Sequence, residues 1–194
     1  PMPEQAPAIR AKNFEEVACG YHPDDALRES ERCLVCPDQP CVSGCPVGIS
    51  IPDFIQKINE KDLRGAYDIL TQTNLLPAIC GRVCPQENQC EGVCTVGESL
   101  EPVAIGRLER FVGDTAIREG WANIPYIEKN GFKVGVVGSG PAGMACAADM
   151  AKAGCEVTVF EAFHQAGGVL KYGIPDFRLP NTVIDAEIAN LIKL

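Results

Sequence analysis

The sequence KVGVVGSGPAGMACAADMAKAGCEVTVFEA, residues 133–162, decides the fold of the C-terminal part of the chain. It begins with a β-branched run that ends in glycines, which predicts a short buried strand. An alanine-rich segment follows and ends at Gly154, as helices commonly do. A second β-branched run then predicts another buried strand. The order strand, turn, helix, strand predicts one βαβ unit with a parallel pair of strands.

The glycines of the turn have the spacing of a dinucleotide-binding loop. Gly138 suits a tight turn, Gly140 lets the backbone approach a pyrophosphate, and Gly143 lets the helix pack closely on the strand. Glu161 ends the second strand, where a carboxylate accepts hydrogen bonds from a ribose and disfavours a 2′-phosphate. The glycine pattern alone is weak evidence, but here it lies between a strand and a helix, as the motif requires. The loop therefore predicts a site for FAD or NAD rather than NADP.

The N-terminal part of the chain is distinguished by its cysteines. Most of the 11 cysteines lie in two quartets, with the spacings C-x2-C-x4-C-x3-C and C-x3-C-x5-C-x3-C. Such closely spaced thiolates suit iron–sulfur clusters, and the two quartets predict two [4Fe–4S] clusters. Zinc is one alternative, although structural zinc sites favour paired CxxC knuckles. Structural thiols or disulfides are a second alternative. The quartets are Cys33, Cys36, Cys41 and Cys45, followed by Cys80, Cys84, Cys90 and Cys94.

The composition excludes several classes of function. The 194 residues carry a net charge of -9, which argues against binding a nucleic-acid backbone. No apolar run reaches the roughly 18 residues of a membrane-spanning helix, and the first residues lack the apolar core of a signal peptide. Many cysteines without an export signal indicate metal or redox chemistry in a reducing compartment, so we expect a cytoplasmic protein. Pro1 in place of Met, and a helical pattern that is uncapped at residue 194, predict a piece of a longer polypeptide.

Short helices are predicted between the cysteines. Apolar spacing places them at 24–34, 51–60, 62–74 and 101–120, with the cysteines on the loops that join them. The three cysteines outside the quartets, Cys19, Cys146 and Cys155, are predicted to be buried small apolar residues.

Several motifs together resemble one protein family. It is the family of glutamate synthase small (beta) subunits, which includes the large subunit of electron-bifurcating NADH-dependent ferredoxin:NADP+ oxidoreductase. The N-terminal part of dihydropyrimidine dehydrogenase is similar but more distant. The resemblance covers almost the whole chain. Its motifs are the two quartets, NLLPAICGRVCPQENQCEGVC (74–94), EPVAIGRLERF (101–111), GSGPAG (138–143) and GGVLKYGIPDFRLP (167–180).

The resemblance implies a fold and an activity. Residues 1–130 would form an α-helical domain with two [4Fe–4S] clusters, and 131–194 the N-terminal βαβ part of a truncated Rossmann-like FAD-binding domain. The activity implied is that of an NAD(P)H-dependent oxidoreductase in which electrons pass between NADPH, FAD and the clusters. NADPH would bind elsewhere in the longer protein, so this segment alone is expected to be inactive with NADPH. No catalytic acid or base is expected, because the cofactors carry the chemistry.

The resemblance also implies an interleaved set of metal ligands. On the residues alone, the favoured interpretation of Glu109 is an ordinary helix-surface carboxylate paired with Arg107 or Arg110, and Cys80 is its rival as a ligand. In the family pattern Glu109 is a ligand and Cys80 is left over. One cluster would then be held by Cys33, Cys36, Cys41 and Cys94, and the other by Cys45, Cys84, Cys90 and Glu109.

For FAD, the resemblance implicates the glycine-rich loop, Glu161, a second glycine turn and an arginine. The arginine would neutralise the pyrophosphate or hold the flavin end. Val169, in the second turn, departs from the Leu that is usual in the family, which is a small apolar change. The residues implicated are Gly138, Ser139, Gly140, Pro141, Ala142, Gly143, Glu161, Gly167, Gly168, Val169 and Arg178.

The partner distinguishes the members of this family. A glutamine amidotransferase-type subunit would indicate a glutamate synthase, and a ferredoxin-reductase-like subunit would indicate a bifurcating oxidoreductase. Self-association into a homo-oligomer is a further expectation that stays open. A non-enzymatic alternative is an assembly module whose clusters or zinc are structural, and iron content distinguishes it from the others.

Overall fold

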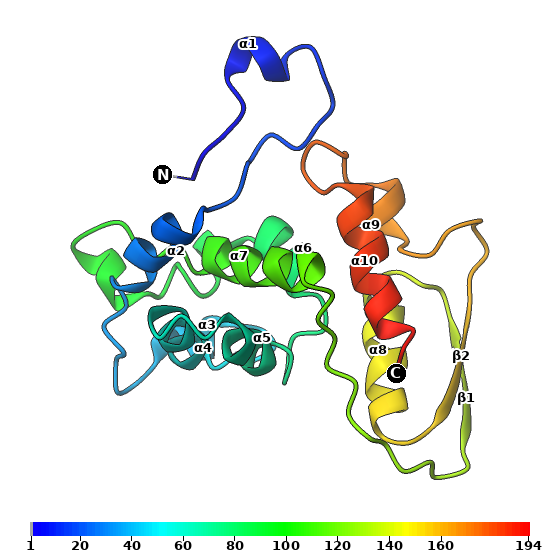
Figure 1. Cartoon of the computed structure of the whole chain (residues 1–194). Helices are drawn as coiled ribbons and strands as arrows, with labels where there is room; N and C mark the ends of the chain where they lie inside the picture. Colours follow the sequence, from blue (N-terminus) through cyan, green and yellow to red (C-terminus); the bar gives the residue numbers. More distant parts are fainter. Residues whose placement is uncertain (1) are drawn as a thin grey trace. The chain divides into compact units, whose positions relative to one another are not determined.

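The chain forms two compact units in a computed structural model, which describes residues 2–194 (Figure 1). One unit contains the segment up to Asn13 together with Val17–Trp121, and the other contains Phe14–Glu16 and Ala122–Leu194. Among the described residues, no helix combines the length and the apolar character needed to cross a bilayer. The first unit contains the helices α1 (Pro7–Arg10), α2 (Pro23–Ser30), α3 (Pro40–Gly44), α4 (Ile51–Asn59), α5 (Leu63–Leu70), α6 (Pro77–Val83) and α7 (Ile105–Arg118), and the 3-10 turns η1 (Gln86–Asn88) and η2 (Thr95–Glu98).

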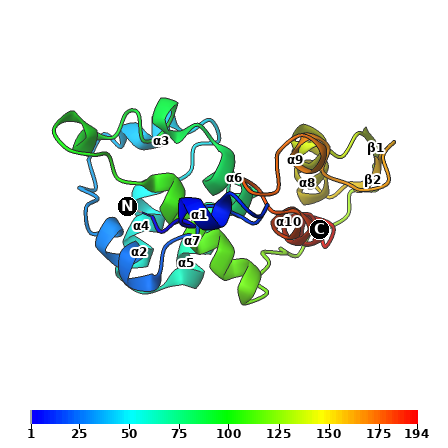
Figure 2. The same cartoon turned by 90° about the horizontal axis from the view of Figure 1, so that it is seen from above.

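The core of the first unit is made from the apolar faces of amphipathic helices. α4 packs against α2 and α5, and α5 packs against α7 (Figure 2). Phe54 of α4, Leu70 of α5 and Leu108 of α7 are fully buried in this core. Burial of each such side chain contributes roughly 1.5–3 kcal/mol before entropy is counted. The four helices predicted from apolar spacing correspond to α2, α4, α5 and α7.

α6 and α7 approach each other closely because glycines lie at their contact. A Cβ added at Gly81 of α6 would be 2.5 Å from the backbone nitrogen of Arg110. A Cβ added at Gly113 of α7 would be 2.6 Å from the backbone nitrogen of Ala78. Any larger residue would therefore force the two helices apart.

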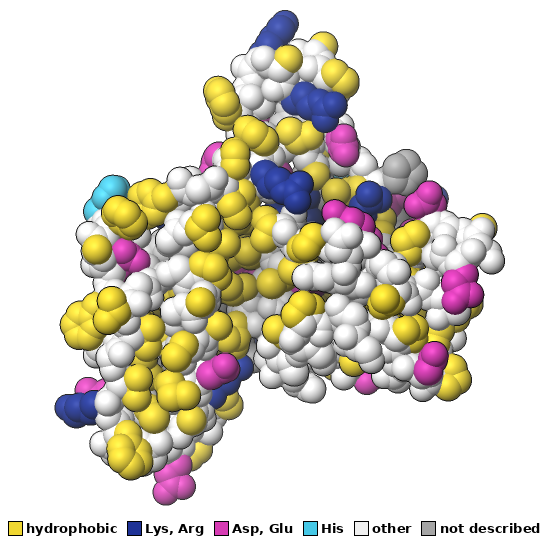
Figure 3. All heavy atoms as spheres, turned by 180° about the vertical axis from the view of Figure 1, so that it is seen from behind, with side chains coloured by type: hydrophobic (Ala, Val, Ile, Leu, Met, Phe, Trp, Pro, Cys, Tyr) yellow, Lys and Arg dark blue, Asp and Glu magenta, His cyan; other side chains and the backbone are white. Residues whose placement is uncertain are grey.

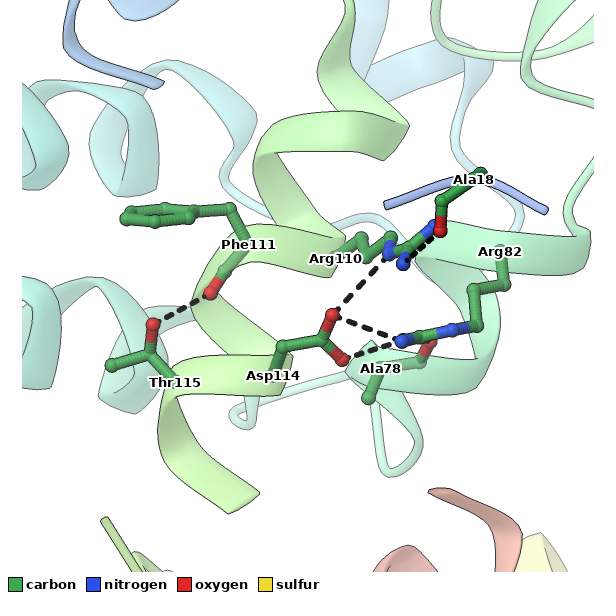
Figure 4. A network of polar contacts seen from close by, with 7 residues as sticks. All are labelled: Ala18, Ala78, Arg82, Arg110, Phe111, Asp114 and Thr115. Atoms are coloured by element: carbon green, nitrogen blue, oxygen red, sulfur yellow. Dashed lines mark hydrogen bonds and ion pairs between the residues drawn. The ribbon is translucent and has the colours of Figure 1, made fainter. Parts of the chain in front are cut away.

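An ion-pair network joins the same two helices (Figure 4). Arg82 of α6 donates to both carboxylate oxygens of Asp114 of α7, at 2.6 and 2.9 Å. Arg110 donates to Asp114 at 3.3 Å and to the backbone carbonyl of Ala18 at 2.8 Å. The Arg82 side chain is only 4% exposed, whereas that of Asp114 is 32% exposed, so the arginine is the buried partner of this bidentate pair. The network holds α6, α7 and the segment around Ala18 together.

Two expectations about the cysteines are wrong. The quartets do not lie wholly on loops, because Cys41 is in α3 and Cys80 is in α6. Proline starts both helices, and its preset φ makes a short helix possible between turns. Cys19 and Cys146 are exposed rather than buried, whereas Cys155 is buried as predicted.

The second unit contains the predicted βαβ element. β1 (Lys133–Val137) pairs in parallel with β2 (Glu156–Phe160), with Gly135 opposite Thr158. The connecting helix α8 (Pro141–Lys152) packs on both strands, and α10 (Asn181–Leu191) lies on the same side of them (Figures 1 and 2). A short helix, α9 (Val169–Tyr172), precedes α10. The parallel pair and its helical crossover are those the sequence predicts.

The opposite face of the two strands is exposed. Val137 and Phe160 point away from α8 and are 89% and 58% exposed. Hydrophobic side chains cover much of the surface of this unit when it is seen from behind (Figure 3). Parallel strands are normally covered on both faces, whereas among the described residues helices cover only one face of this pair.

Candidate metal centre and nucleotide loop

Cysteines from both quartets line each of two cavities in the first unit. The first cavity is lined by four cysteines and by apolar residues such as Ile55 and Val103. Cys45 does not line it, although it belongs to the first quartet, whereas Cys94 of the second quartet does. The thiols at this cavity are those of Cys33, Cys36, Cys41 and Cys94.

The loop from Cys33 to Cys41 adopts an unusual backbone conformation at this cavity. Val35 and Gln39 have φ values of 49° and 43°, in the left-handed region that favours glycine. Holding a residue there costs roughly 1–3 kcal/mol, and such strain concentrates at binding sites. The loop thus has the tight curvature that closely spaced ligands need.

The second cavity is lined by four cysteines and one carboxylate. Ile51 and Ile105 line both cavities, so the two sites are neighbours. Glu109 is 5% exposed, so its interpretation as a helix-surface carboxylate is wrong. The donors at the second cavity are Cys45, Cys80, Cys84, Cys90 and Glu109.

Close backbone packing brings the two quartets together. A Cβ added at Gly44, next to Cys45, would be 2.6 Å from Val93 Cγ2 and 3.0 Å from the Gln89 carbonyl oxygen. Glycine at this position lets the loop of the first quartet lie directly on the loop of the second. This contact is what allows ligands from both quartets to line each cavity.

Burial affects the thiols of the first cavity. It raises the pKa of the Cys33 thiol and raises the pKa of the Cys41 thiol to about 11. The desolvated thiolate is disfavoured in both cases. These thiols therefore keep their protons at neutral pH until a metal displaces them.

The second cavity contains a coupled pair of thiols. A hydrogen bond with Cys80 lowers the pKa of Cys84 to about 7. The same bond, followed by burial and the nearby negative charge of Glu109, raises the pKa of Cys80 strongly. Burial raises the pKa of Cys90 to about 12. In this pair the shared hydrogen bond favours the thiolate at Cys84 and the protonated thiol at Cys80.

Three residues at the cavities are absent from the sequence-based prediction. Asn74 is 4% exposed, and its side-chain nitrogen donates to Glu109 Oε1 at 2.5 Å. Glu91, between Cys90 and Cys94, accepts from the backbone nitrogen of Gly106 at 2.9 Å and so anchors that loop to the start of α7. Thr95 Oγ1 lies 3.4 Å from Cys36 Sγ. Asn74 and Glu91 lie within the quoted motif 74–94, but the motif does not reveal their contacts, because each partner belongs to another segment of the chain.

The donors do not meet at a single point. Within the described residues 2–194, no group of three Cys, His, Asp or Glu side chains is placed to bind one metal ion. Ligands of a zinc ion lie about 2.0–2.3 Å from it and so crowd together. The donors instead line the walls of the two cavities, an arrangement that suits a group of several atoms.

The nucleotide loop of the second unit is shaped by its glycines. Gly138 has a φ of 95°, which lets the chain turn sharply after β1. A Cβ added at Gly143 would be 2.0 Å from the Gly138 carbonyl oxygen, so only glycine lets α8 pack here. Gly140 caps α8 in an extended conformation, with only the Cα of Gly168 near a Cβ, at 4.0 Å. The start of α8 is thus open to a ligand and carries the positive end of the helix dipole.

Glu161 braces this loop from the end of β2. Its carboxylate accepts from the backbone nitrogen of Ser139 at 2.9 Å, from the Ser139 hydroxyl, and from the backbone nitrogen of Phe163 at 2.8 Å. These bonds, that of Phe163 foremost, lower the pKa of Glu161 to about 2. Glu161 is therefore ionised at neutral pH and holds the turn in place.

The second glycine turn lies against the loop, but the arginine does not join it. The backbone nitrogen of Gly167 donates to the Ser139 carbonyl at 3.1 Å, and a Cβ on Gly168 would be 2.7 Å from Gly140 Cα. Val169 is exposed, as are Pro141 and Ala142 at the start of α8. Arg178 is exposed, and no hydrogen bond or ion pair found among the described residues links its side chain to the loop.

Known protein families match both units. Residues 10–121 match the family described as dihydropyrimidine dehydrogenase domain II, 4Fe-4S cluster. Residues 136–188 match the NAD(P)-binding Rossmann-like domain. The first match covers more than half of the chain, so the chain belongs to the family of dihydropyrimidine dehydrogenase domain II. It is a 4Fe-4S domain followed by a Rossmann-like region.

Individual relatives are similar over almost the whole chain. A protein of Escherichia coli (strain K12) named as oxidoreductase UacF is 42% identical over 90% of this chain. The glutamate synthase [NADPH] small chain of Halomonas elongata is 39% identical over 96%, and the NAD-dependent dihydropyrimidine dehydrogenase subunit PreT of Escherichia coli O157:H7 is 38% identical over 93%. The chain spans 28%, 40% and 44% of the lengths of these three relatives. The predicted resemblance to glutamate synthase small subunits is confirmed.

Proposed function

We propose that this chain is the electron-transfer portion of an NAD(P)H-dependent flavin and iron–sulfur oxidoreductase similar to the glutamate synthase small subunit. One observation carries the proposal: the two quartets are interleaved between two neighbouring cavities, each with at least four donors. Interleaving alone suits a cross-braced pair of zinc ions as well as two clusters, so the matched family and the donor chemistry are what favour clusters. The matched 4Fe-4S family and the softness of thiolate donors support iron–sulfur clusters.

The residues fit two [4Fe–4S] clusters. When bound, the clusters and the flavin supply the one-electron chemistry, and the protein's residues hold them and tune their potentials. The strained loop at Val35 and the Thr95 hydroxyl beside Cys36 would position the ligand sulfurs of the first cavity. We assign Cys33, Cys36, Cys41 and Cys94 to one cluster, and Cys45, Cys84, Cys90 and Glu109 to the other.

The Rossmann-like region would hold the ADP half of FAD. The open start of α8 offers backbone nitrogens to a pyrophosphate, and Glu161 is ionised and near the ribose position of such sites. Residues 1–130 then form the iron–sulfur domain and 131–194 the beginning of the FAD domain. NADPH would bind outside these residues, so the segment alone would not oxidise it. The proposed location is the cytoplasm.

The proposed partner is a second redox subunit. A glutamine amidotransferase-type subunit would complete a glutamate synthase, and a ferredoxin-reductase-like subunit would complete a bifurcating oxidoreductase. The two cavities fit a glutamate synthase and a bifurcating oxidoreductase equally well. Copurification of the partner from the native source is therefore the experiment that distinguishes the two. Its identification by mass spectrometry assigns the electron acceptor.

Iron analysis tests the proposal directly. Protein purified without oxygen should be brown and contain about eight iron atoms and eight sulfides per chain. Reduction with dithionite should produce EPR signals of two clusters. Colourless protein with stoichiometric zinc would instead establish the structural assembly module, and about four iron atoms would establish a single cluster.

A further inference from the structure

The second cavity has one donor more than a [4Fe–4S] cluster needs. This inference rests on the proposed function, because it concerns the ligands of the second cluster. Cys45, Cys84 and Cys90 leave one position, for which Cys80 and Glu109 compete. A thiolate is the softer donor and would ordinarily be preferred by iron in a sulfur-rich cluster. A feature of the structure must therefore determine whether Cys80 or Glu109 is the fourth ligand.

Asn74 contacts both competitors. Its side-chain nitrogen Nδ2 donates to Glu109 Oε1 at 2.5 Å. Its side-chain oxygen Oδ1 lies 3.5 Å from Cys80 Sγ. Asn74 is 4% exposed and Glu109 is 5% exposed, so water does not replace these contacts. The Asn74 side-chain amide thus contacts Glu109 through its nitrogen and Cys80 through its oxygen.

The chemistry of the neighbours determines which end faces which donor. Oδ1 accepts the backbone N–H of Leu76 at 3.0 Å, and a backbone N–H only donates. The other end of the amide, the NH₂ group, donates to Glu109 Oε1 and so faces the carboxyl group. The amide cannot flip without losing both bonds. Cys80 Sγ therefore faces a carbonyl oxygen, which offers no proton to a thiolate and so favours the thiol, whose single proton also faces Cys84.

We propose that Asn74 is a specificity-determining residue that selects Glu109 over Cys80 as the fourth donor of the second cluster. Its NH₂ group directs the Glu109 carboxylate into the cavity, and its carbonyl oxygen retains the Cys80 thiol. Without the NH₂ group, Cys80 replaces Glu109. In that exchange the Cys80 proton goes to solvent, its sulfur binds the iron, and the Glu109 oxygen leaves, so four donors remain.

Asn74→Asp replaces the selecting NH₂ group by a carboxylate oxygen. Aspartate has nearly the same shape and still accepts from Leu76, so the turn into α6 keeps its bond. It cannot donate to Glu109 and places a second negative charge beside it. Asn74→Ser, which also keeps an oxygen acceptor and lacks the amide donor, is the second variant if Asn74→Asp does not fold. Circular dichroism establishes folding for each.

The experiment combines these variants with Cys80→Ala in the full chain, purified without oxygen. We expect about eight iron atoms in the unsubstituted protein, in Cys80→Ala and in Asn74→Asp, but about four in Asn74→Asp/Cys80→Ala. The EPR signal of the second cluster should also change its g values in Asn74→Asp, a change that a purely structural role would not produce. Cys146→Ser, an exposed cysteine of α8, is the matched control.

The outcomes separate this inference from the proposed function. Loss of half of the iron in Cys80→Ala alone shows that Cys80 is already the ligand and overturns the inference. Full iron in the double variant, or loss in Asn74→Asp alone, overturns it as well. If the unsubstituted protein itself lacks two clusters, the proposed function fails before the question of selection arises.

Discussion

The first cavity takes Cys33 and Cys94 from segments far apart in the chain, whereas the nucleotide loop takes Ser139, Gly140 and Gly143 from one turn. In the helical unit, the cavities form where α4, α7 and the two cysteine-bearing segments pack together. In the Rossmann-like unit, one turn between β1 and α8 supplies the loop, and Glu161 from the end of β2 braces it. A site built from distant segments depends on every contact that joins them, and a local site depends on its own backbone.

The strongest way to test this difference is to remove two cysteines that are neighbours in the sequence. Cys41→Ala should empty the first cavity and Cys45→Ala the second, because the two residues line different cavities. Each variant should retain about four of eight iron atoms. EPR spectra of the reduced proteins should show the loss of different signals. Loss of the same EPR signal in both variants would mean that Cys41 and Cys45 bind the same cluster.

A second test concerns the ion pair that joins α6 to α7. Asp114→Ala leaves the buried Arg82 without its carboxylate and should lower the free energy of unfolding by roughly 1–3 kcal/mol. Asp68→Ala removes a pair with Arg64 whose side chains are 48% and 44% exposed, and should cost less than about 1 kcal/mol. Urea denaturation of the two variants measures the difference. Equal effects would show that burial of Arg82 does not make this ion pair more stabilising than an exposed one.

The nucleotide loop allows a sharper comparison between two of its own glycines. Gly143→Ala places a Cβ on the Gly138 carbonyl and should destabilise the second unit by roughly 1–3 kcal/mol. Gly140→Ala meets no protein atom closer than 4.0 Å, so the fold should be unaffected. Its FAD affinity should nevertheless fall about tenfold or more, equivalent to about 1.4 kcal/mol. Thermal denaturation and flavin titration distinguish the two, and unchanged flavin binding in Gly140→Ala would contradict the proposed site.

The smallest expected effect is the pH dependence of the loop. The pKa of Glu161 is lowered from 4.5 to about 2, so its hydrogen bonds stabilise the folded state above pH 4.5. That contribution is lost as the pH falls from about 4.5 to about 2, when the carboxylate becomes protonated. Glu161→Gln should abolish this part of the acid transition, which is measured by fluorescence between pH 5 and pH 2 in both proteins. An identical transition in the variant would contradict the role of Glu161.

Prediction from the sequence succeeds where a feature is local. The βαβ unit and the glycine loop follow from β-branched runs, glycine spacing and the position of Glu161, all within residues 133–162. α2, α4, α5 and α7 follow from apolar periodicity. The placement of Cys41 and Cys80 on helices was missed because both helices are short, start with proline and have no apolar stripe.

Prediction fails where the relevant partner is distant. Asn74, Glu91 and Arg82 look ordinary in the sequence, yet they contact Glu109, Gly106 and Asp114. The burial of Glu109 has the same origin, since a carboxylate beside two arginines would otherwise suit a solvated helix surface. The ligand sets came from a family resemblance rather than from residue spacing and remain a proposal.

By itself, the sequence determined that the chain joins a cysteine-rich helical region to a nucleotide-binding βαβ unit. Spacing and periodicity suffice for this, because strands, helices and tight turns are governed by interactions between near neighbours. Only the tertiary structure decided how the cysteines are divided between two cavities and which polar residues face them. That division depends on glycine contacts such as Gly44 on Val93 and Gly81 on Arg110, where the absence of a side chain lets distant backbones touch.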